Sequence, residues 1–457
     1  MRLLLLSAGF VLSFAGNAQD TLKSMSLEAF LAHVKENHPV ALVASNSVLQ
    51  AQQIVRLSKG AFDPAVFAGI DQKYFNGTTY YSTITSGIKI PTRIGVDLKV
   101  MADWNRGDYL NPQSRVPDDG LSYLGVEVPI GRGLFTDDRR TQLRRAEVAL
   151  QQSGTEQQLT LNSLLYEAGK QFLVWQEQQA QLELAKEGLE LAELRLKQVR
   201  AAAEIGDRPA IDTVEALAQF INRKIDFDQR SLDEANARLG VQQYLWEKGT
   251  LPLELETYVK AEPLLPVAPK LISADSVDNH PWLSWYDLKL SDLKLEKKLK
   301  VEQLKPQLNF NYNLLQSPSD LISTNYSITN YKWGASFYVP ILLRKERSSL
   351  EVTKLKILST QYDQQLKARE INTKLLQVRN DWAARWSQCQ SALEVSRNYF
   401  TLTLAERSLF ELGESSLFLI NAREMSYLSA QSKYLEYAAK TQKSALETEY
   451  ALGTLGR

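Results

Sequence analysis

The chain has 457 residues, and its 53 lysines and arginines balance its 53 aspartates and glutamates, so the formal net charge is zero. This balance argues against a nucleic-acid binder built on a broad basic face. Hydrophobic residues make up 44% of the chain, which is too many for a disordered protein, and the mean hydropathy of −0.28 excludes a bundle of membrane-spanning helices. The single cysteine, Cys389, excludes an internal disulfide framework and a cysteine-rich zinc site.

The first residues have the three parts of a secretory signal peptide. Arg2 precedes an apolar run at residues 3–14, and the small residues Gly16 and Ala18 stand before Gln19. We therefore expect residues 1–18 to be removed on export. The apolar run has about 12 residues, too few to cross a bilayer core of roughly 30 Å as a helix. We expect an exported mature protein that has no membrane-spanning helix and, since no cysteine follows the cleavage site, no lipid anchor.

Short motifs recur in the two halves of the chain, in the same order and with similar spacing. Residues 37–39 match 279–281, Pro64 matches Pro306, 128–130 match 339–341, and 205–207 match 412–414. This order predicts two tandem repeats, residues 19–249 and 274–457, with an insertion among the strands of the first. The proline-rich segment 250–273 would join them as a linker. The matched His38 and His280 are interpreted as helix-start residues of the duplication rather than as a metal pair.

Each repeat is predicted to contain a helix, strands, a long helix and a returning helix. The first helix of each repeat is expected at about 27–59 and 282–304. The segments 136–204 and 345–411 contain no proline, and at 1.5 Å per residue each would form a helix of roughly 100 Å. The returning helices are expected at about 210–246 and 417–452. Apolar residues that step by three and four predict coiled-coil packing of the first long helix, namely Leu182, Ala185, Leu189, Ala192 and Leu196.

The strands of the second repeat, within about 308–339, alternate between apolar or aromatic residues and polar ones. Each run has about nine residues, the length of a tilted outer-membrane strand. A half-buried strand of a soluble sheet is the alternative interpretation. The first repeat, within about 66–128, has four such segments, at 66–75, 84–90, 94–100 and 122–128. The extra pair joined at residues 91–93 is either additional wall strands or a long extracellular hairpin.

The signal peptide, the two helix-and-strand repeats and the glycines after the long helices resemble the TolC family of outer-membrane efflux proteins, the outer membrane factors. The resemblance implies an α+β membrane fold in which long α-helical hairpins of three chains form a periplasmic α-barrel, continued by an outer-membrane β-barrel. It also implies a homotrimer in the outer membrane of a Gram-negative bacterium, extending into the periplasm. Such a protein is the passive exit duct of a tripartite efflux or type I secretion system. Its partners would be outer-membrane lipid, a periplasmic adaptor (membrane fusion) protein and, indirectly, an inner-membrane pump; the linker would be an equatorial belt.

The glycine turns carry the most specific match. In the family a glycine is followed by Asp at plus six and Ala at plus ten, and here Gly206 is followed by Asp212 and Ala216. The second copy departs from this pattern, because Leu419 and Arg423 stand at the matching positions after Gly413, which puts an acidic gate there in doubt. By resemblance, the tips that dock the adaptor are residues 205–209 and 412–416, with the candidates Gly206, Asp207, Asp212, Gly413, Glu414 and Ser415. A role as helix caps alone is the alternative.

Four aromatic residues are candidates for an interfacial girdle: Trp104, Tyr109, Tyr331 and Trp333. Packing in a protein core is the alternative for all four. We find no nucleophile elbow, phosphate-binding glycine loop or metal-ligand helix, so the chain is not expected to be an enzyme and no catalytic, cofactor or metal residues are assigned. A soluble periplasmic coiled-coil adaptor or scaffold is the alternative function, and it would lack membrane strands.

Overall fold

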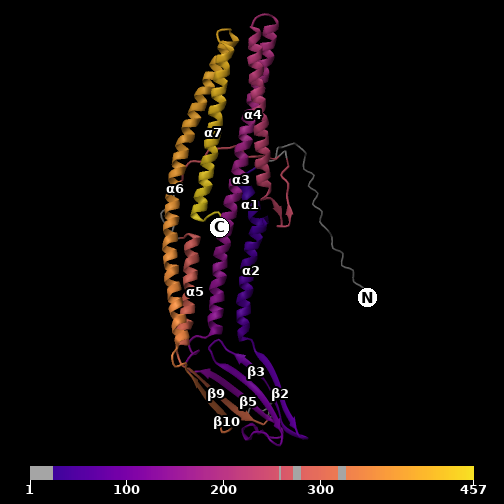
Figure 1. Ribbon diagram of the computed structural model, residues 1–457, viewed down its shortest axis with the longest axis vertical. Helices are drawn as coiled ribbons and strands as arrows, with labels where there is room; N and C mark the ends of the chain where they lie inside the picture. Colours follow the sequence, from indigo (N-terminus) through magenta and orange to yellow (C-terminus); the bar gives the residue numbers. More distant parts are fainter. Residues whose placement is uncertain (1–23, 257–258, 271–278, 318–325, 457) are drawn as a thin grey trace, which may run out of the picture. The chain divides into compact units, whose positions relative to one another are not determined.

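The computed structural model describes residues 24–256, 259–270, 279–317 and 326–456 (Figure 1). The signal peptide expected at residues 1–18 lies outside this part of the chain, as do linker residues 257–258 and 271–273. The described residues form two compact units. We call residues 24–38, 168–267 and 385–443 the hairpin unit, and residues 39–167, 268–384 and 444–456 the sheet unit. Each unit takes elements from both predicted repeats, so the division into repeats stays a prediction.

The hairpin unit is mainly helical. It contains α1 (Leu27–Asn37), residues 168–204 of α3 (Asp138–Glu204), α4 (Ala210–Gln242), residues 385–411 of α6 (Arg344–Glu411) and most of α7 (Leu417–Leu452). Helices α3 and α4 form one antiparallel hairpin, and α6 and α7 form the other (Figure 1). None of the described helices is both long enough and apolar enough to cross a membrane.

Two groups of buried side chains hold the helices of the hairpin unit together. Beside the turns, α3, α4 and α7 supply one apolar cluster of Leu196, Val199, Ala216, Leu417 and Ile420, and Phe410 of α6 packs against it. Farther along α3, the rings of Phe30 and Phe172 stack at 5.2 Å, and Trp175 meets Phe172 edge-on. Trp175 is fully buried, and its Nε1 donates to Glu234 at 2.9 Å. Burial of large side chains together with satisfied polar groups is the pattern of a stable core.

The described part of the linker lies along the helices of the hairpin unit. Strand β8 (Lys260–Ala261) pairs in parallel with β1 (Ser24–Met25), and β7 (Leu251–Pro252) pairs with β6 (Trp246–Glu247). Gln176 of α3 donates to the Glu262 carbonyl at 2.8 Å, and the amide of Val267 donates to Thr441 of α7 at 3.0 Å. Side chains of α3 and α7 therefore form hydrogen bonds with backbone groups of an extended segment that has few partners in a sheet.

The sheet unit combines helices with one sheet. Its helices are α2 (Pro39–Lys59), residues 138–167 of α3, α5 (Pro281–Gln303), residues 344–384 of α6 and the end of α7, with short 3-10 turns η1 (Gly60–Phe62) and η2 (Pro112–Ser114). Arg145 of α3 binds Asp292 of α5 through two hydrogen bonds of 2.7 and 2.8 Å. His280 is the N-cap of α5, and its Nδ1 accepts from the amide of Trp282 at 3.1 Å.

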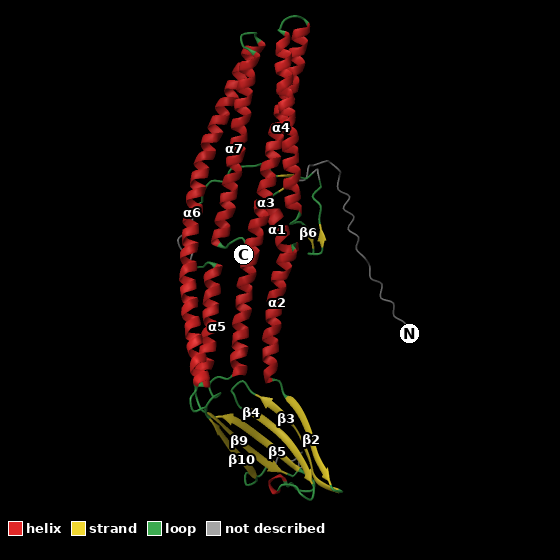
Figure 2. Cartoon of the chain, viewed as in Figure 1, coloured by secondary structure: helices red, strands yellow, loops and turns green. Residues whose placement is uncertain are grey.

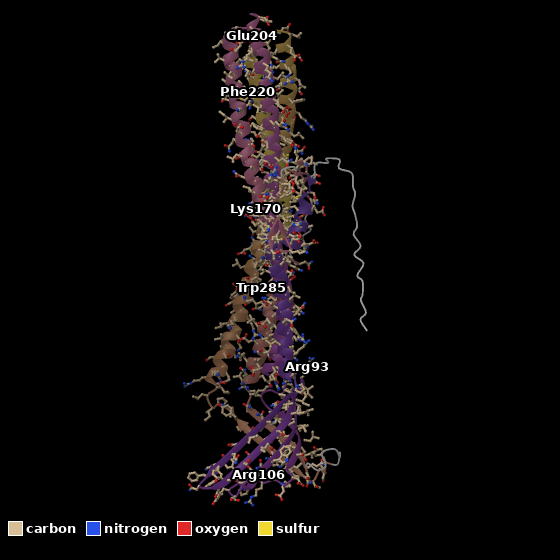
Figure 3. The ribbon with its side chains drawn as sticks, turned by 90° about the vertical axis from the view of Figure 1, so that its right-hand side faces the viewer. Arg93, Arg106, Lys170, Glu204, Phe220 and Trp285 are labelled. Carbon is tan, nitrogen blue, oxygen red and sulfur yellow. The ribbon has the colours of Figure 1, made fainter. Side chains whose placement is uncertain are left out.

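The sheet has six antiparallel strands in the order β10-β9-β5-β4-β3-β2 (Figure 2). Their bounds are β2 Ala65–Phe75, β3 Thr78–Pro91, β4 Asp97–Arg106, β5 Leu121–Pro129, β9 Gln307–Gln316 and β10 Tyr331–Tyr338. The extra pair of the first repeat, β3 and β4, is hydrogen-bonded within the sheet along ten residue pairs. Of the two interpretations left open by the sequence, the pairing therefore agrees with additional strands of the same sheet. Figure 3 labels Arg93, in the turn before β4, and Arg106, at its far end.

Some predicted boundaries differ from the structure. The helix expected at 27–59 is interrupted at His38, which is extended (φ −71°, ψ 136°), because Pro39 has no N–H and disfavours a helical residue before it. The strand expected at 94–100 begins at Asp97, since residues 92–96 form a turn closed by the amide of Thr92 and the carbonyl of Val96 at 3.2 Å. The strand expected at 84–90 begins earlier, at Thr78, and the helix expected to reach 246 ends at Gln242.

Candidate functional site: a two-faced sheet and two hairpin turns

One face of the sheet is apolar from edge to edge. Successive side chains of a strand point to opposite faces, so residues paired across strands share a face. One row of pairs crosses all six strands through Tyr331, Leu314, Leu124, Val100, Ile88 and Val66. Val66 is 79% exposed and Tyr331 is 52% exposed. Apolar side chains on a continuous exposed surface of this kind mark contact with lipid or with another protein.

The opposite face of the same strands is polar. Asn309, Asn311 and Asn313 alternate along β9, and Asn311 pairs with Glu127 of β5 and Gly334 of β10. Two cross-strand ion pairs lie on this face, Lys99 with Glu127 at 2.5 Å and Lys89 with Asp97 at 2.9 Å. The sheet therefore has one apolar face and one polar face.

The four aromatic candidates lie at the strand ends farther from the helices. Trp104, Tyr331 and Trp333 lie on the apolar face by register, opposite Ile84, Leu314 and Tyr312. Tyr109 follows β4 in the loop and stacks on Tyr80 at 4.5 Å. The exposed fractions are 38% for Trp104, 65% for Tyr109, 52% for Tyr331 and 60% for Trp333. Their exposure distinguishes them from buried core aromatics such as Trp175.

The two hairpin turns have the same backbone geometry. Gly206 and Gly413 have φ values of +80° and +79°. In the first turn the amide of Gly206 donates to Ala203 at 3.1 Å and that of Asp207 to Ala202 at 2.9 Å. In the second, Gly413 donates to Phe410 and Glu414 to Leu409, at 3.2 and 2.9 Å. This pair of bonds is the Schellman motif, in which a glycine with positive φ ends a helix.

The other candidate residues of the first turn lie close to the glycine. Asp212, in the first turn of α4, is 3.8 Å from Arg208. Ala216, four residues on, is 2% exposed and packs in the cluster beside the turns. Ile205 is 81% exposed. The turn thus presents the apolar side chain of Ile205 to solvent, while Asp212 is half-buried beside Arg208. Figure 3 shows Glu204, the last residue of α3, at this end of the hairpin.

The second turn has the same shape with different side chains. Ser415 donates a hydrogen bond to Glu406 of α6, and Leu412 is 73% exposed. Leu419, at plus six, is 43% exposed, and Arg423, at plus ten, lies 3.8 Å from Glu406. The acidic residue of the first turn therefore has no counterpart at this position.

The structure also brings together residues that the sequence did not single out. Arg195 of α3 donates to Glu424 of α7 at 2.7 Å, and both side chains are about nine-tenths buried. The ring of Phe410 lies beneath this guanidinium group. Burial lowers the pKa of Arg195, and the charge of Glu424 opposes that shift. Arg195 and Glu424 are 229 positions apart, so only a three-dimensional fold could identify the pair.

Comparisons with solved structures identify the fold. The open-state outer membrane channel MtrE of Neisseria gonorrhoeae aligns with 94% of this chain and 89% of its own, at a TM-score of 0.68 and 13% identity. The Campylobacter jejuni CmeC outer membrane channel aligns with 99% of this chain and 94% of its own, at 0.62 and 12%. The outer membrane protein VceC of Vibrio cholerae covers 93% and 96%, at 0.64 and 10%. No family model and no curated protein matches. The chain therefore has the fold of outer-membrane channels, as the resemblance implied.

Among the described residues, no group of three or more His, Cys, Asp and Glu side chains is placed to hold a metal ion.

Proposed function

We propose that this protein is an outer-membrane channel and serves as the passive exit duct of a tripartite efflux or type I secretion system. The observation that carries the proposal is the six-stranded sheet with one apolar and one polar face, attached to helices in the fold of outer-membrane channels. The apolar face suits lipid and the polar face suits a water-filled pore. An exit duct needs no catalytic residue, because its pump supplies the energy.

The edges of the sheet support assembly from several copies. Strands β2 and β10 are the two edge strands, and nearly all their residues are exposed. Strand directions alternate across the sheet, so β10 of one copy would run antiparallel to β2 of the next. Such edge-to-edge pairing continues the ladder and, once the ring closes, leaves no free edge. Three copies, the number implied by the family resemblance, would then share one β-barrel.

Helix α4 of the hairpin unit carries an exposed apolar surface that also suits assembly from several copies. Ile211, Ile225, Leu232 and Leu239 are separated by seven residues or a multiple of seven, and Ala218 fills the missing position. The four large side chains are 55 to 70% exposed. A seven-residue apolar repeat is the contact surface of a coiled coil. We infer that it packs against a helix of the neighbouring copy, in the periplasmic α-barrel of a homotrimer.

The hairpin turns are the proposed docking points for a periplasmic adaptor protein. Their backbone is fixed by the Schellman bonds of Gly206 and Gly413, and Ile205 and Leu412 are exposed beside them. A rigid turn with an exposed apolar residue loses little entropy on binding a partner. Asp207, Asp212, Glu414 and Ser415 would add polar contacts.

The first experiment is fractionation of cells that express the full chain, followed by native mass measurement of the detergent-extracted protein and conductance recording in planar bilayers. A trimer in the outer-membrane fraction that conducts ions would support the proposal. A soluble periplasmic monomer would refute it and favour the adaptor or scaffold alternative. A membrane trimer without conductance would leave the location intact and refute the open duct.

A further inference from the structure

A small pocket lies between α3 and α6 beside the first hairpin turn. Its volume is about 280 Å³, and its polar lining comes from Arg195, Gln198, Arg208, Arg407 and Glu411, around the ring of Phe410. All of these residues belong to the hairpin unit. Three guanidinium groups and one carboxylate line the pocket, and the carboxylates of Glu424 and Asp212 lie beside it.

The aromatic ring orients two of the cations. The guanidinium of Arg208 lies 4.1 Å from the ring centroid of Phe410, and that of Arg195 lies 4.9 Å from it. A guanidinium group stacked on a ring keeps the N–H groups at its edge free to point sideways. Phe410 therefore holds two planar donors in place before any ligand arrives.

The carboxylates around the pocket leave part of this donor capacity unused. Glu424 takes a short hydrogen bond from Nη2 of Arg195 but lies 3.6 Å from Arg407. Asp212 lies 3.8 Å from Arg208. Both longer distances exceed that of a hydrogen bond. The Nε of Arg195 is buried and has no hydrogen-bond partner in the structure, although a buried donor is normally satisfied.

We propose that this pocket binds an oxyanion, a carboxylate or phosphate group, held by Arg195, Arg208 and Arg407. Guanidinium groups bind both kinds of anion through paired, charge-assisted hydrogen bonds. Arg195 and Arg407 come from different hairpins, so a bound anion would also link the α3–α4 hairpin to α6. The proposal does not depend on the channel function, because it concerns binding to the isolated chain.

Two sources could supply the anion. A pocket of this volume admits a free phosphate or a small carboxylic acid, and its position beside the turn at 205–209 also admits an acidic side chain of a docked protein. The chemistry is the same in both cases. Titration with separate probes distinguishes them.

The test is calorimetric titration of the detergent-solubilised full chain with inorganic phosphate, with citrate and with a hexaglutamate peptide, at low ionic strength. Arg208→Gln is the principal variant, because this side chain is 20% exposed and lies at the turn. Loss of one charge-assisted bond, worth roughly 1.5–3 kcal/mol, should weaken binding at least about tenfold. Arg200→Gln, at an exposed arginine near the end of α3, is the control and should bind normally.

Each outcome bears on the proposal. Binding of phosphate or citrate that depends on Arg208 supports a free anion as the ligand, and binding of the peptide alone supports an acidic side chain. Failure of all three probes to bind would overturn the proposal, as would equal binding by the Arg208 and Arg200 variants. Circular dichroism of Arg195→Gln and Arg208→Gln checks that the helices remain folded. If Arg195→Gln unfolds, Arg208→Gln still decides the question.

Discussion

Apolar side chains differ in exposure between the cluster beside the hairpin turns and the apolar face of the sheet. Beside the hairpin turns, Val199 and Ile420 are 1% and 0% exposed. On the apolar face of β2, Val66 and Ile70 are 79% and 74% exposed. The helices near the turns supply apolar partners for this cluster, whereas the side chains on the apolar face of the sheet stay exposed in the single chain. We therefore infer that folding of the chain buries the cluster, and that membrane insertion or assembly would cover the apolar face of the sheet.

The largest expected effect comes from emptying the cluster beside the turns. Ile420→Ala would leave a cavity among four helices and should lower the free energy of unfolding by about 2–5 kcal/mol. The measurement is urea unfolding followed by far-ultraviolet circular dichroism. Ile205→Ala, at an 81% exposed position of the adjacent turn, is the control and should change stability by less than about 0.5 kcal/mol. Equal losses for the two variants would contradict the contrast between buried and exposed positions.

Adjacent residues of β4 test the two faces of the sheet. Val100 lies on the apolar face and Met101 on the polar face. Val100→Lys would place a charge against lipid, at a cost of roughly 2–4 kcal/mol near the bilayer midplane, and should reduce the amount of protein in the outer-membrane fraction. Met101→Lys adds the same charge toward the polar side and should insert nearly normally. If both variants inserted equally, the apolar face would not contact lipid.

The features predicted from the sequence are those set by local chemistry. Gly206 and Gly413 predicted the two helix ends, because a positive φ favours glycine wherever it occurs. The alternation at 308–314 predicted β9, because a two-residue period is a property of the strand itself. Most long-helix boundaries agree with the structure to within two residues, since these segments contain strong helix formers and end at glycine or proline.

The features missed depend on contacts between distant residues. Of the coiled-coil positions expected on α3, Ala185 and Leu196 are buried, whereas Leu182, Leu189 and Ala192 are only partly buried. The buried stripe instead includes Arg195, which tolerates its position because Glu424 reaches it from α7. The start of β4 was placed too early because Ile94 continues the apolar alternation. The turn there also depends on Arg140 of α3, which donates to the carbonyl of Ile94 at 3.4 Å.

The two turns should respond alike to a smaller perturbation. Gly206→Ala and Gly413→Ala each force a side chain onto a backbone with φ near +80°, at a cost of about 1–2 kcal/mol. No atom lies within 4 Å of the added Cβ at either site, so backbone strain alone sets the cost. Urea unfolding measures it. Gly154→Ala is the opposite control, because this glycine is inside α3 with no atom within 4 Å, and the change should stabilise the helix by up to about 1 kcal/mol.

The smallest effect concerns the ionisation of a tyrosine inside the helical part of the sheet unit. Tyr166 stacks on Tyr450 at 4.3 Å, and burial, followed by the nearby charges of Glu447 and Glu167, raises its pKa to about 12. The folded state favours the neutral phenol, so this contribution to stability is complete below pH 10, the pKa of an unfolded tyrosine, and is lost as the pH rises toward 12. Subtracting the phenolate absorbance of Tyr166→Phe from that of the native protein isolates the ionisation of Tyr166. This difference should reach half of its maximum near pH 12. A midpoint near pH 10, the ordinary tyrosine value, would mean that water reaches this ring, and the contrast between closed helical packing and exposed sheet would weaken.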